Sequence, residues 1–357
     1  MIRDLDLSAV VFLGTLSIGA LAVTPQVVAG GLPDAPVWQG QWAGELSSRF
    51  ESGWPGQELA VGVWGALEYG LLASGRRGVL VGTDDWLYTS EELEISPDSS
   101  ARQARAVQLV RAAADQLSGH GGTVVVALIP DKSRVCGDTL RRHQRPAELE
   151  DRYAQLRSSL IEAGAVVPDL TEVLACTGTE PEPFLRTDTH WSPEGAAAVA
   201  TQLAEQLPQR QGSQKFRELA RPDEPHTGDL VSFLALGSFE SALGPAPSIL
   251  RTRSVVADAQ VLDSAALFGD TAPAMVLVGT SFSADSRWGF ADSLRWSFRQ
   301  EVDNRAASGE GPFEPMQRFV DAPDAQPAVL IWEFPERYLA VESPAPESTD
   351  VATPKSP

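Results

Sequence analysis

The chain has 357 residues, 43% of them hydrophobic, so it can bury a sizeable core as one large domain or two smaller ones. Its formal net charge at pH 7 is -20, and only three lysines occur in the whole sequence. Nucleic-acid-binding surfaces neutralise phosphates with clustered Lys and Arg, so this charge balance argues against a nucleic-acid partner.

Residues 1–30 are expected to form a signal anchor or a signal peptide. A run without charged residues extends from Leu7 to about Val28, which is long enough to cross a bilayer at about 1.5 Å per residue. The small residues Ala20-Leu21-Ala22 resemble a cleavage signal, but Arg3 is the only positive charge before the run. We favour export over a buried core helix, and anchoring in the inner membrane over cleavage.

The remaining sequence divides by composition. Residues 31–80 begin with a stretch rich in Gly, Pro and Trp and are expected to form a connector and the start of a domain. Residues 81–342 contain no repeat and no second linker, so we expect one domain there. Residues 343–357 are rich in Pro, Ser, Thr and Glu and are expected to form a disordered tail.

Residues 81–342 alternate between helical and strand-like patterns. We expect helices at about 101–117, 146–163, 192–207 and 288–300, and strands at 123–130, 165–170, 274–279 and 328–334. Ser192 and Pro193 fit the N-cap and the first turn of the third helix. Unbroken apolar strands between helices predict an α/β fold with a doubly wound, mostly parallel sheet.

Ligand and catalytic sites of such sheets lie at the carboxyl ends of the strands. Four residues with reactive side chains follow the expected strands or lie in loops beyond them: Cys136, Asp188, Ser281 and Glu333. We therefore expect these four residues to converge.

The two cysteines, Cys136 and Cys176, bear on the cellular compartment. Disulfides persist in exported proteins, so one disulfide between these residues would suit an extracytoplasmic domain. Two free buried thiols are the alternative.

Asp188, His190 and Ser281 supply the parts of a catalytic triad. A serine hydroxyl is a poor nucleophile until an imidazole takes its proton, and an aspartate on the other ring nitrogen orients that imidazole. Asp188 and His190 are two residues apart, so they face the same way in an extended segment. The other histidines fit solvated surface positions or a Pro-rich loop: His120, His143 and His226.

Other interpretations of these residues stay open. Asp188 could cap a helix beside a packed His190, and Ser281 could be an ordinary serine at a strand end. Ser283 is a competing nucleophile two residues away. A metal site needs more ligands, and the sequence has no histidine pair at i, i+4 and no cysteine cluster, so we expect neither a metal nor a cofactor.

Two blocks resemble the signature of the AlgX/AlgJ-like family, the SGNH hydrolase-like alginate O-acetyltransferases: Asp188-Thr189-His190-Trp191-Ser192-Pro193-Glu194-Gly195 and Val278-Gly279-Thr280-Ser281-Phe282-Ser283. Further blocks agree in the same order, at residues 82–88, 129–134, 228–230, 309–312 and 331–337. The resemblance covers about residues 82–339. In layout the chain looks closer to AlgJ, since a short polar segment stands where AlgX has a carbohydrate-binding module.

The resemblance implies a triad of Asp188, His190 and Ser281. It also implies transfer of an acetyl group onto hydroxyls of an exported, alginate-like polysaccharide, outside the cytoplasmic membrane. A membrane-bound O-acyltransferase is the implied partner and acetyl source.

The order of the blocks carries information of its own. Ordinary SGNH hydrolases place the serine early and the Asp/His block last, whereas here Asp188 and His190 precede Ser281. This order is expected of a circularly permuted sheet. Under permutation, residues 302–309 fall at the oxyanion-hole block, so Gly309 becomes a candidate backbone donor beside the Ser281 amide.

Further binding residues are weaker candidates. Arg337 could stabilise charge or bind the glycan, with a surface ion pair as the alternative. Lys132 and Arg134 follow a strand end and could contact an acidic polymer or a polar sugar. Trp191 and Trp288 flank the site blocks and could stack on sugar rings, although core packing is the more frequent use of tryptophan.

Three functions therefore remain open at the level of sequence. The first is an exported polysaccharide O-acetyltransferase. The second is a secreted carbohydrate esterase with the same triad, in which water accepts the acetyl group. The third is a non-catalytic subunit of a polysaccharide export complex.

Overall fold

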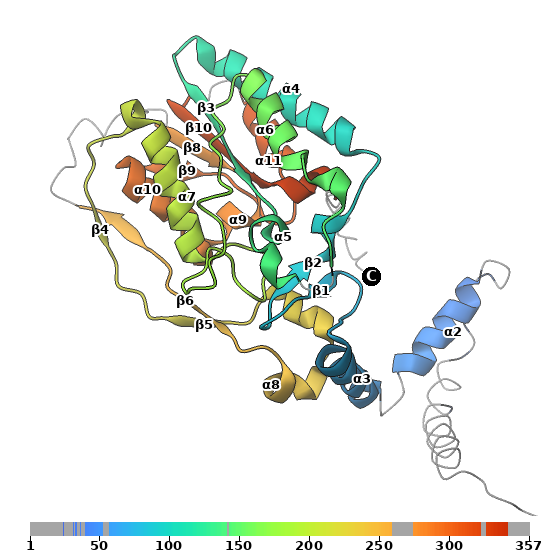
Figure 1. Cartoon of the computed structure of the whole chain (residues 1–357). Helices are drawn as coiled ribbons and strands as arrows, with labels where there is room; N and C mark the ends of the chain where they lie inside the picture. The colour runs from blue at the N-terminus through green and yellow to red at the C-terminus, as the bar shows by residue number, and fades with distance from the viewer. Residues whose placement is uncertain are drawn as a thin grey trace, which may run out of the picture. The chain divides into compact units, whose positions relative to one another are not determined.

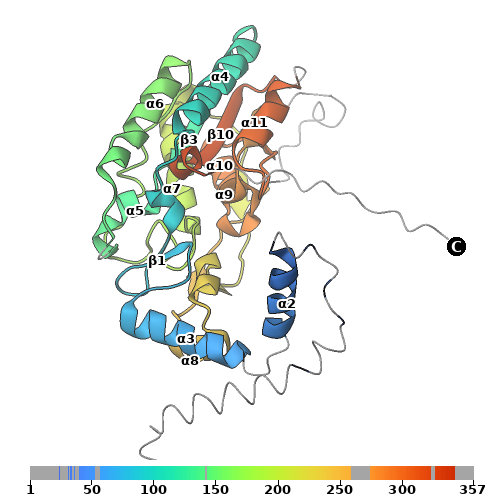
Figure 2. The same ribbon diagram turned by 90° about the vertical axis from the view of Figure 1, so that its right-hand side faces the viewer.

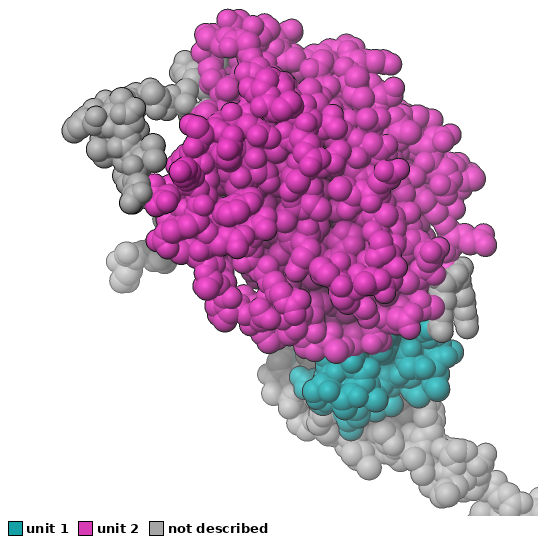
Figure 3. Space-filling model, turned by 60° about the vertical axis from the view of Figure 1, so that its left-hand side comes forward, with its two compact units in different colours: residues 1–76, 234–244 teal, residues 77–233, 245–357 magenta. Residues whose placement is uncertain are grey.

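The computed structural model describes residues 40–52, 57–140, 143–258, 274–322 and 326–341, together with the single residues 24, 31, 33 and 36. These belong to two compact units, coloured separately in Figure 3: residues 1–76 with 234–244, and residues 77–233 with 245–357. Apart from residue 24, the expected anchor segment 1–30 lies outside the described residues, as does the expected tail 343–357. Within the described part of the chain, no helix combines the length and apolar character needed to span a bilayer.

The first unit is helical. It contains α2 (Gln41–Ser52), α3 (Gln57–Leu72), the 3-10 turn η7 (Gly237–Phe239) and α8 (Glu240–Leu243). The buried side of α3 carries Gly62 and Gly65, where an added Cβ would lie 2.8 Å from the Leu236 carbonyl oxygen and 2.5 Å from that of Leu234. Residues far apart in the sequence thus form this unit together.

The second unit is built on a four-stranded parallel sheet with the order β3-β10-β8-β9 (Figure 1). Its strands are β3 (Thr123–Ile129), β8 (Met275–Val278), β9 (Val302–Asn304) and β10 (Val329–Pro335). Among the described strands of this sheet, β10 is the last in sequence, and it inserts between β3 and β8, with Val329 opposite both Thr123 and Met275. Because all pairings are parallel, the carboxyl ends of the strands share one edge of the sheet.

Successive residues of a strand point to opposite sides of a sheet. Nearly every residue of β3, β8 and β10 is buried, so both faces of this sheet are covered. On one face, alternate strand residues such as Val125 and Ile331 pack with α7 (Pro193–Gln206) and α10 (Phe290–Phe298). The other face packs against three helices: α4 (Ser99–Ser118), α6 (Arg152–Glu162) and α11 (Phe313–Val320). Figure 2 shows these helices around the sheet. The predicted α/β fold with a doubly wound parallel sheet is confirmed.

Short antiparallel pairs and turns complete the second unit. The pairs are β1 (Val79–Val81) with β2 (Leu87–Thr89), β4 (Phe216–Glu218) with β7 (Val255–Ala257), and β5 (Glu224–His226) with β6 (Ser248–Leu250). The short helices are α5 (Lys132–Val135) and α9 (Ser281–Ala284). The 3-10 turns are η2 (Ser90–Leu93), η3 (Gly137–Thr139), η4 (Ala147–Leu149), η5 (Pro208–Arg210), η6 (Asp229–Leu234, which runs to the unit boundary), η9 (Ser286–Trp288) and η10 (Glu336–Leu339).

One predicted strand, at residues 165–170, was wrong. Only Val166 pairs with the sheet, through an isolated parallel bridge to Val125. The amide of Val166 donates to Val124 and its carbonyl accepts from Val126, both at 2.9 Å. The next ladder donor would come from Pro168, which has no N–H, so the pairing stops there.

Cys136 and Cys176 form a disulfide, which decides between the two alternatives for these cysteines. The bond joins the segment after β3 to the segment that leads toward Asp188, across a sequence separation of 40 residues. It therefore links the edge of the sheet to the long loop that carries part of the candidate site.

We predict that a double Cys136→Ser, Cys176→Ser variant unfolds at lower urea concentration than the parent protein. Closing a loop of this length reduces the entropy of the unfolded chain, and the loss should amount to about 4 kcal/mol in the free energy of unfolding. Urea titrations followed by circular dichroism measure it, with the reduced parent protein as the matched control. Equal midpoints for variant and parent would contradict the prediction.

Candidate active site

Ser281 lies where β8 turns into α9, at the carboxyl edge of the sheet. Strand β8 ends at Val278, and Thr280 caps α9 by accepting a hydrogen bond from the Phe282 amide at 3.3 Å. Ser281 is the first residue of this helix and is partly exposed. The amides of Phe282, Ser283 and Ala284 all donate to Thr280, so the groups that this turn can present to a substrate are the Ser281 hydroxyl and the Ser281 amide, the first N–H of the helix.

A buried carboxylate on β10 holds this turn in place. Glu333 is fully buried and accepts hydrogen bonds from the Thr280 amide at 3.0 Å and from Ser283 Oγ at 2.7 Å. Burial raises the pKa of Glu333 above its ordinary value, against the opposing effect of these donors. A Cβ at Gly279 would lie 2.5 Å from Glu333 Oε2, so only glycine permits the contact. Ser283 is thereby engaged with Glu333, while Ser281 is the serine that contacts His190.

Hydrogen bonds join the three residues of the predicted triad in series. Asp188 Oδ1 lies 2.6 Å from His190 Nδ1, and His190 Nε2 lies 2.8 Å from Ser281 Oγ. An ionised carboxylate only accepts, so Nδ1 carries the proton and Nε2 of the neutral ring accepts from the Ser281 hydroxyl. This is the geometry that a base-activated hydroxyl requires, and the catalytic role of the three residues stays a prediction.

Aromatic side chains fix the ring of His190. Trp288 stacks on it with ring centres 5.0 Å apart, and Phe282 lies 4.7 Å away on a tilted plane. Trp191 supports the same turn by donating from Nε1 to the Phe282 carbonyl at 3.1 Å. Trp191 and Trp288 are almost fully buried. The hypothesis that they stack on sugar rings was therefore wrong, and their role is core packing.

The second oxygen of Asp188 is also engaged. Its Oδ2 accepts from His226 Nε2 at 2.7 Å and from the Asp229 amide at 3.1 Å. Burial alone would raise the pKa of Asp188, but the hydrogen bonds from His190 and His226 outweigh it and hold that pKa well below its usual range. Sequence reasoning placed His226 in a loop and missed this contact, although the 228–230 block begins two residues further on.

Lys132 is a buried clamp on the segment before Asp188. Its ammonium lies 2.6–3.1 Å from the carbonyl oxygens of Leu87, Leu185, Arg186 and Asp188, which are four acceptors for its three N–H donors, and the residue is 1% exposed. Burial lowers the pKa of Lys132 to about 7, against the opposing effect of the Glu92 and Asp188 carboxylates. The expectation that Lys132 contacts an acidic polymer was wrong, because all its donors are used inside the protein.

The arginine candidates likewise make internal contacts. Arg134 donates to both oxygens of Glu336 at 3.1 and 3.0 Å. Arg337 is buried, lies 3.3 Å from Glu91, and places its guanidinium 5.4 Å from the Phe282 ring centre. Because Arg337 is buried, the glycan-binding role expected of it was wrong. The Arg134 side chain keeps 15% exposure, and its glycan-binding role stays a prediction.

Gly309 follows a segment that lies against the Ser281 turn. The Ala307 amide donates to the Gly279 carbonyl at 3.1 Å, which ties residues near Gly309 to the end of β8. Gly309 itself has φ +80°, in the left-handed region that favours glycine. Its role as an oxyanion donor stays a prediction.

Asp188, His190 and Asp229 also bring ligand atoms within 4.8 Å of one another, as a metal site would. The 2.6 Å between Asp188 Oδ1 and His190 Nδ1 is a hydrogen-bond distance. Two ligands at about 2.1 Å from one ion and at right angles would lie about 3 Å apart. The Asp229 oxygens accept from the Thr189 amide and hydroxyl at 2.9 and 2.6 Å. These contacts favour a hydrogen-bonded cluster.

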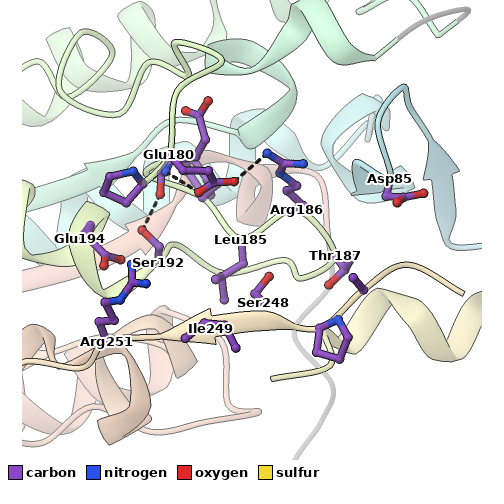
Figure 4. A pocket seen from close by; sticks show the side chains of 15 residues that line it. Asp85, Glu180, Leu185, Arg186, Thr187, Ser192, Glu194, Ser248, Ile249 and Arg251 are labelled. Carbon is purple, nitrogen blue, oxygen red and sulfur yellow. Dashed lines mark hydrogen bonds and ion pairs between the residues drawn. The ribbon is translucent and has the colours of Figure 1, made fainter. Parts of the chain in front are cut away.

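A pocket of about 360 Å³ adjoins the segment before Asp188 (Figure 4). Thr187 lines it, and so does Ser248, the register partner of His226 across β5 and β6. Its charged lining comprises four carboxylates and two guanidinium groups: Asp85, Glu180, Glu182, Glu194, Arg186 and Arg251. None of the triad residues lines this pocket, and its negative balance does not suit a polyanion.

We predict that Asp188→Asn lowers the stability of the protein in a pH-dependent way. The pKa of Asp188 is lower in the folded chain than in the unfolded one, so its ionised form stabilises the fold above about pH 4. This contribution is lost as the pH falls through the folded-state pKa. Urea titrations at several pH values should show a difference between parent and variant that is full at neutral pH and shrinks in acid. If the difference in unfolding free energy between parent and variant did not change with pH, the lowered pKa of Asp188 would be contradicted.

Comparison with known proteins identifies the family. Residues 79–336 match the model of the SGNH hydrolase-like domain of the acetyltransferase AlgX. The chain is 35% identical over 339 residues to the probable alginate O-acetylase AlgJ of Pseudomonas syringae pv. tomato, covering 92% of this chain and 86% of that one. It is 34% identical to the probable alginate O-acetylase AlgJ of Pseudomonas aeruginosa, covering 96% and 91%.

Solved structures agree with this match. The O-acetyltransferase domain of Pseudomonas putida AlgJ superposes with a TM-score of 0.65 at 33% identity, over 75% of this chain and 94% of that one. Pseudomonas aeruginosa AlgX shares the fold, with a TM-score of 0.55 at 22% identity over 74% and 63% of the two chains. The chain therefore belongs to the SGNH hydrolase-like acetyltransferase family of AlgX and AlgJ, and it is an acyltransferase.

Proposed function

We propose that this chain transfers acetyl groups onto hydroxyls of an exported, alginate-like polysaccharide through a triad of Ser281, His190 and Asp188. The observation that carries the proposal is the hydrogen-bond series from Asp188 Oδ1 through the His190 ring to Ser281 Oγ, at 2.6 and 2.8 Å. Relatives named alginate O-acetylases support the class of acceptor. Metal chemistry is not needed for this reaction, because the imidazole supplies the base.

In the first half-reaction Ser281 Oγ attacks the carbonyl carbon of an acetyl donor, and His190 Nε2 takes the hydroxyl proton. The carbonyl π electrons move onto oxygen, giving a tetrahedral oxyanion. Asp188 stabilises the imidazolium across the 2.6 Å contact. When the oxyanion collapses, the bond to the donor's leaving group breaks and His190 returns the proton to that group. Ser281 is left as an acetyl ester.

In the second half-reaction a sugar hydroxyl takes the place of Ser281 as nucleophile. His190 Nε2 removes its proton as it attacks the acetyl carbon, and the new oxyanion collapses with cleavage of the Ser281 ester bond. The proton returns to Ser281 Oγ. The net change is one acetyl group moved from donor to sugar, with the enzyme regenerated.

The oxyanion formed in both steps needs hydrogen-bond donors at its oxygen. The Ser281 amide is our first candidate, because it opens α9 where N–H groups lack helical acceptors. Gly309 is the second, because the preceding Ala307 is bonded to Gly279 beside the same turn. Two backbone donors would serve this purpose without adding a charge near the polymer.

We place this reaction outside the cytoplasmic membrane. The Cys136–Cys176 disulfide supports an oxidising compartment, and the uncharged N-terminal run supports export with retention at the inner membrane. A triad of this kind needs an activated acetyl ester on its own side of the membrane. We propose a membrane-bound O-acyltransferase as the partner that delivers it.

We predict that Ser281→Ala abolishes acetylation of the polymer, lowering the rate by at least about 1000-fold, because the nucleophile is gone. Ser283→Ala is the matched control: it loses a hydrogen bond to Glu333 but keeps the Ser281 to His190 contact. Mass spectrometry after brief exposure to an activated acetyl ester should find the adduct on Ser281 in the parent and in the Ser283 variant. Full activity of Ser281→Ala would overturn the proposed mechanism.

We further predict that the acceptor is a sugar hydroxyl in preference to water. Release of the leaving group from a chromogenic acetyl ester should speed up when mannuronate oligosaccharides are added, and those oligosaccharides should gain the mass of acetyl groups. Neutral oligosaccharides of equal length provide the control for acceptor class. Rapid ester hydrolysis that oligosaccharides leave unchanged, with no acetylated product, would show an esterase instead.

A further inference from the structure

His226 extends the series of hydrogen bonds beyond Asp188. It lies at the end of β5, is 9% exposed, and has its Nε2 at 2.7 Å from Asp188 Oδ2. Asp188 thus lies between two imidazoles, with His190 on one carboxylate oxygen and His226 on the other. The triad mechanism uses only the first of these histidines.

Arg287 settles which nitrogen of His226 bears the proton. Arg287 Nη1 lies 3.3 Å from His226 Nδ1, and a guanidinium has donors only. His226 Nδ1 must therefore accept, so the proton is on Nε2 and points at Asp188. Arg287 is itself fixed by Asp285, whose Oδ2 accepts from Nε at 3.0 Å and from Nη2 at 2.6 Å. His226 is then a neutral ring with a defined tautomer between a cation and an anion.

Packing holds His226 in register with the triad. The β5–β6 pair places His226 opposite Ser248, and a Cβ at Gly228 would overlap the carbonyl oxygen of Thr187, so the two loops are in close contact. Trp288 lies edge-on to His226 with ring centres 5.4 Å apart while its face stacks on His190. One tryptophan thus sets the planes of both imidazoles.

We propose that His226 is a positioning residue for acetyl transfer, an inference that rests on the function proposed above. As a neutral Nε2–H donor it occupies Asp188 Oδ2 and leaves Oδ1 to face His190. Together with the Asp229 amide at 3.1 Å it fixes the rotation of the carboxylate. It also keeps that carboxylate ionised and limits how strongly Asp188 retains a proton on His190.

Two substitutions test this role. His226→Phe keeps a ring against Trp288 but removes the donor, whereas His226→Gln keeps an N–H that can reach Asp188. We expect His226→Phe to lower kcat about 10- to 100-fold, by analogy with the loss of residues that orient metal-ligating side chains, with the KM for the acceptor nearly unchanged. His226→Gln should recover most of the activity.

The pH–rate profile separates positioning from a merely structural role. The charged groups facing His226 are Asp188 and Arg287, the latter paired with Asp285. Without the His226 donor, the Asp188 carboxylate should hold a proton on His190 more strongly. The acidic limb of the profile should then move to higher pH in His226→Phe and return toward the parent position in His226→Gln.

Arg287→Gln is a third variant at a partly exposed position, where the fold is least at risk. Without the Arg287 donor, the His226 ring is no longer restricted to the Nε2–H tautomer. We expect a smaller decrease in kcat than in His226→Phe, and a shift of the acidic limb of the pH–rate profile in the same direction. If His226→Phe does not fold, this variant carries the test. Folded variants with the parent kcat and pH profile would overturn the inference. Should Ser281→Ala also stay active, the proposed function itself fails, whereas an inactive Ser281→Ala leaves that function standing.

Discussion

The site depends on keeping one buried carboxylate ionised. Asp188 is only 2% exposed, and a buried charge is costly unless it is paired and hydrogen-bonded. Four donors meet that need: the amide and Nδ1 of His190, Nε2 of His226 and the amide of Asp229. They come from two chain segments about forty residues apart, and the loops of the second unit bring those segments together.

Other buried polar groups align the parts around Asp188. The Lys132 ammonium bonds to the Leu87 carbonyl on β2 and to the Leu185 and Asp188 carbonyls, and so it holds the segment 185–188 against β2. The main chain of Asp188 is therefore fixed as well as its side chain. On the nucleophile's side, the buried Glu333 organises the turn at Thr280. The two acids have opposite environments, since hydrogen bonds lower the pKa of Asp188 while burial raises that of Glu333. Asp188 accepts a hydrogen bond from the His190 ring, whereas Glu333 accepts hydrogen bonds from the turn that carries Ser281.

Sequence predicted the sheet and placed Ser281 at its edge, because long apolar runs define parallel strands and parallel strands end at one edge. The contact of Ser281 with His190 and Asp188 was predicted from the chemistry of a triad and from the family resemblance. It misplaced Lys132 because cationic side chains are usually exposed, and a lysine that binds carbonyls leaves no spacing signal. It missed His226 because its contact with Asp188 spans 38 positions. Burial of Trp191 and Trp288 follows from packing against Phe282 and His190, which only the tertiary fold reveals.

The charge of the chain constrains how an alginate-like acceptor reaches Ser281. A net charge of -20 repels a polyanion, and salt screens that repulsion beyond about 8 Å at physiological ionic strength. The net charge therefore does not steer a polyanion toward the protein, and short-range contacts would have to supply its recognition. A covalent intermediate suits this situation. In the mechanism proposed above, Ser281 holds the acetyl group between the two half-reactions, so the donor and the polymer need not be bound at the same time.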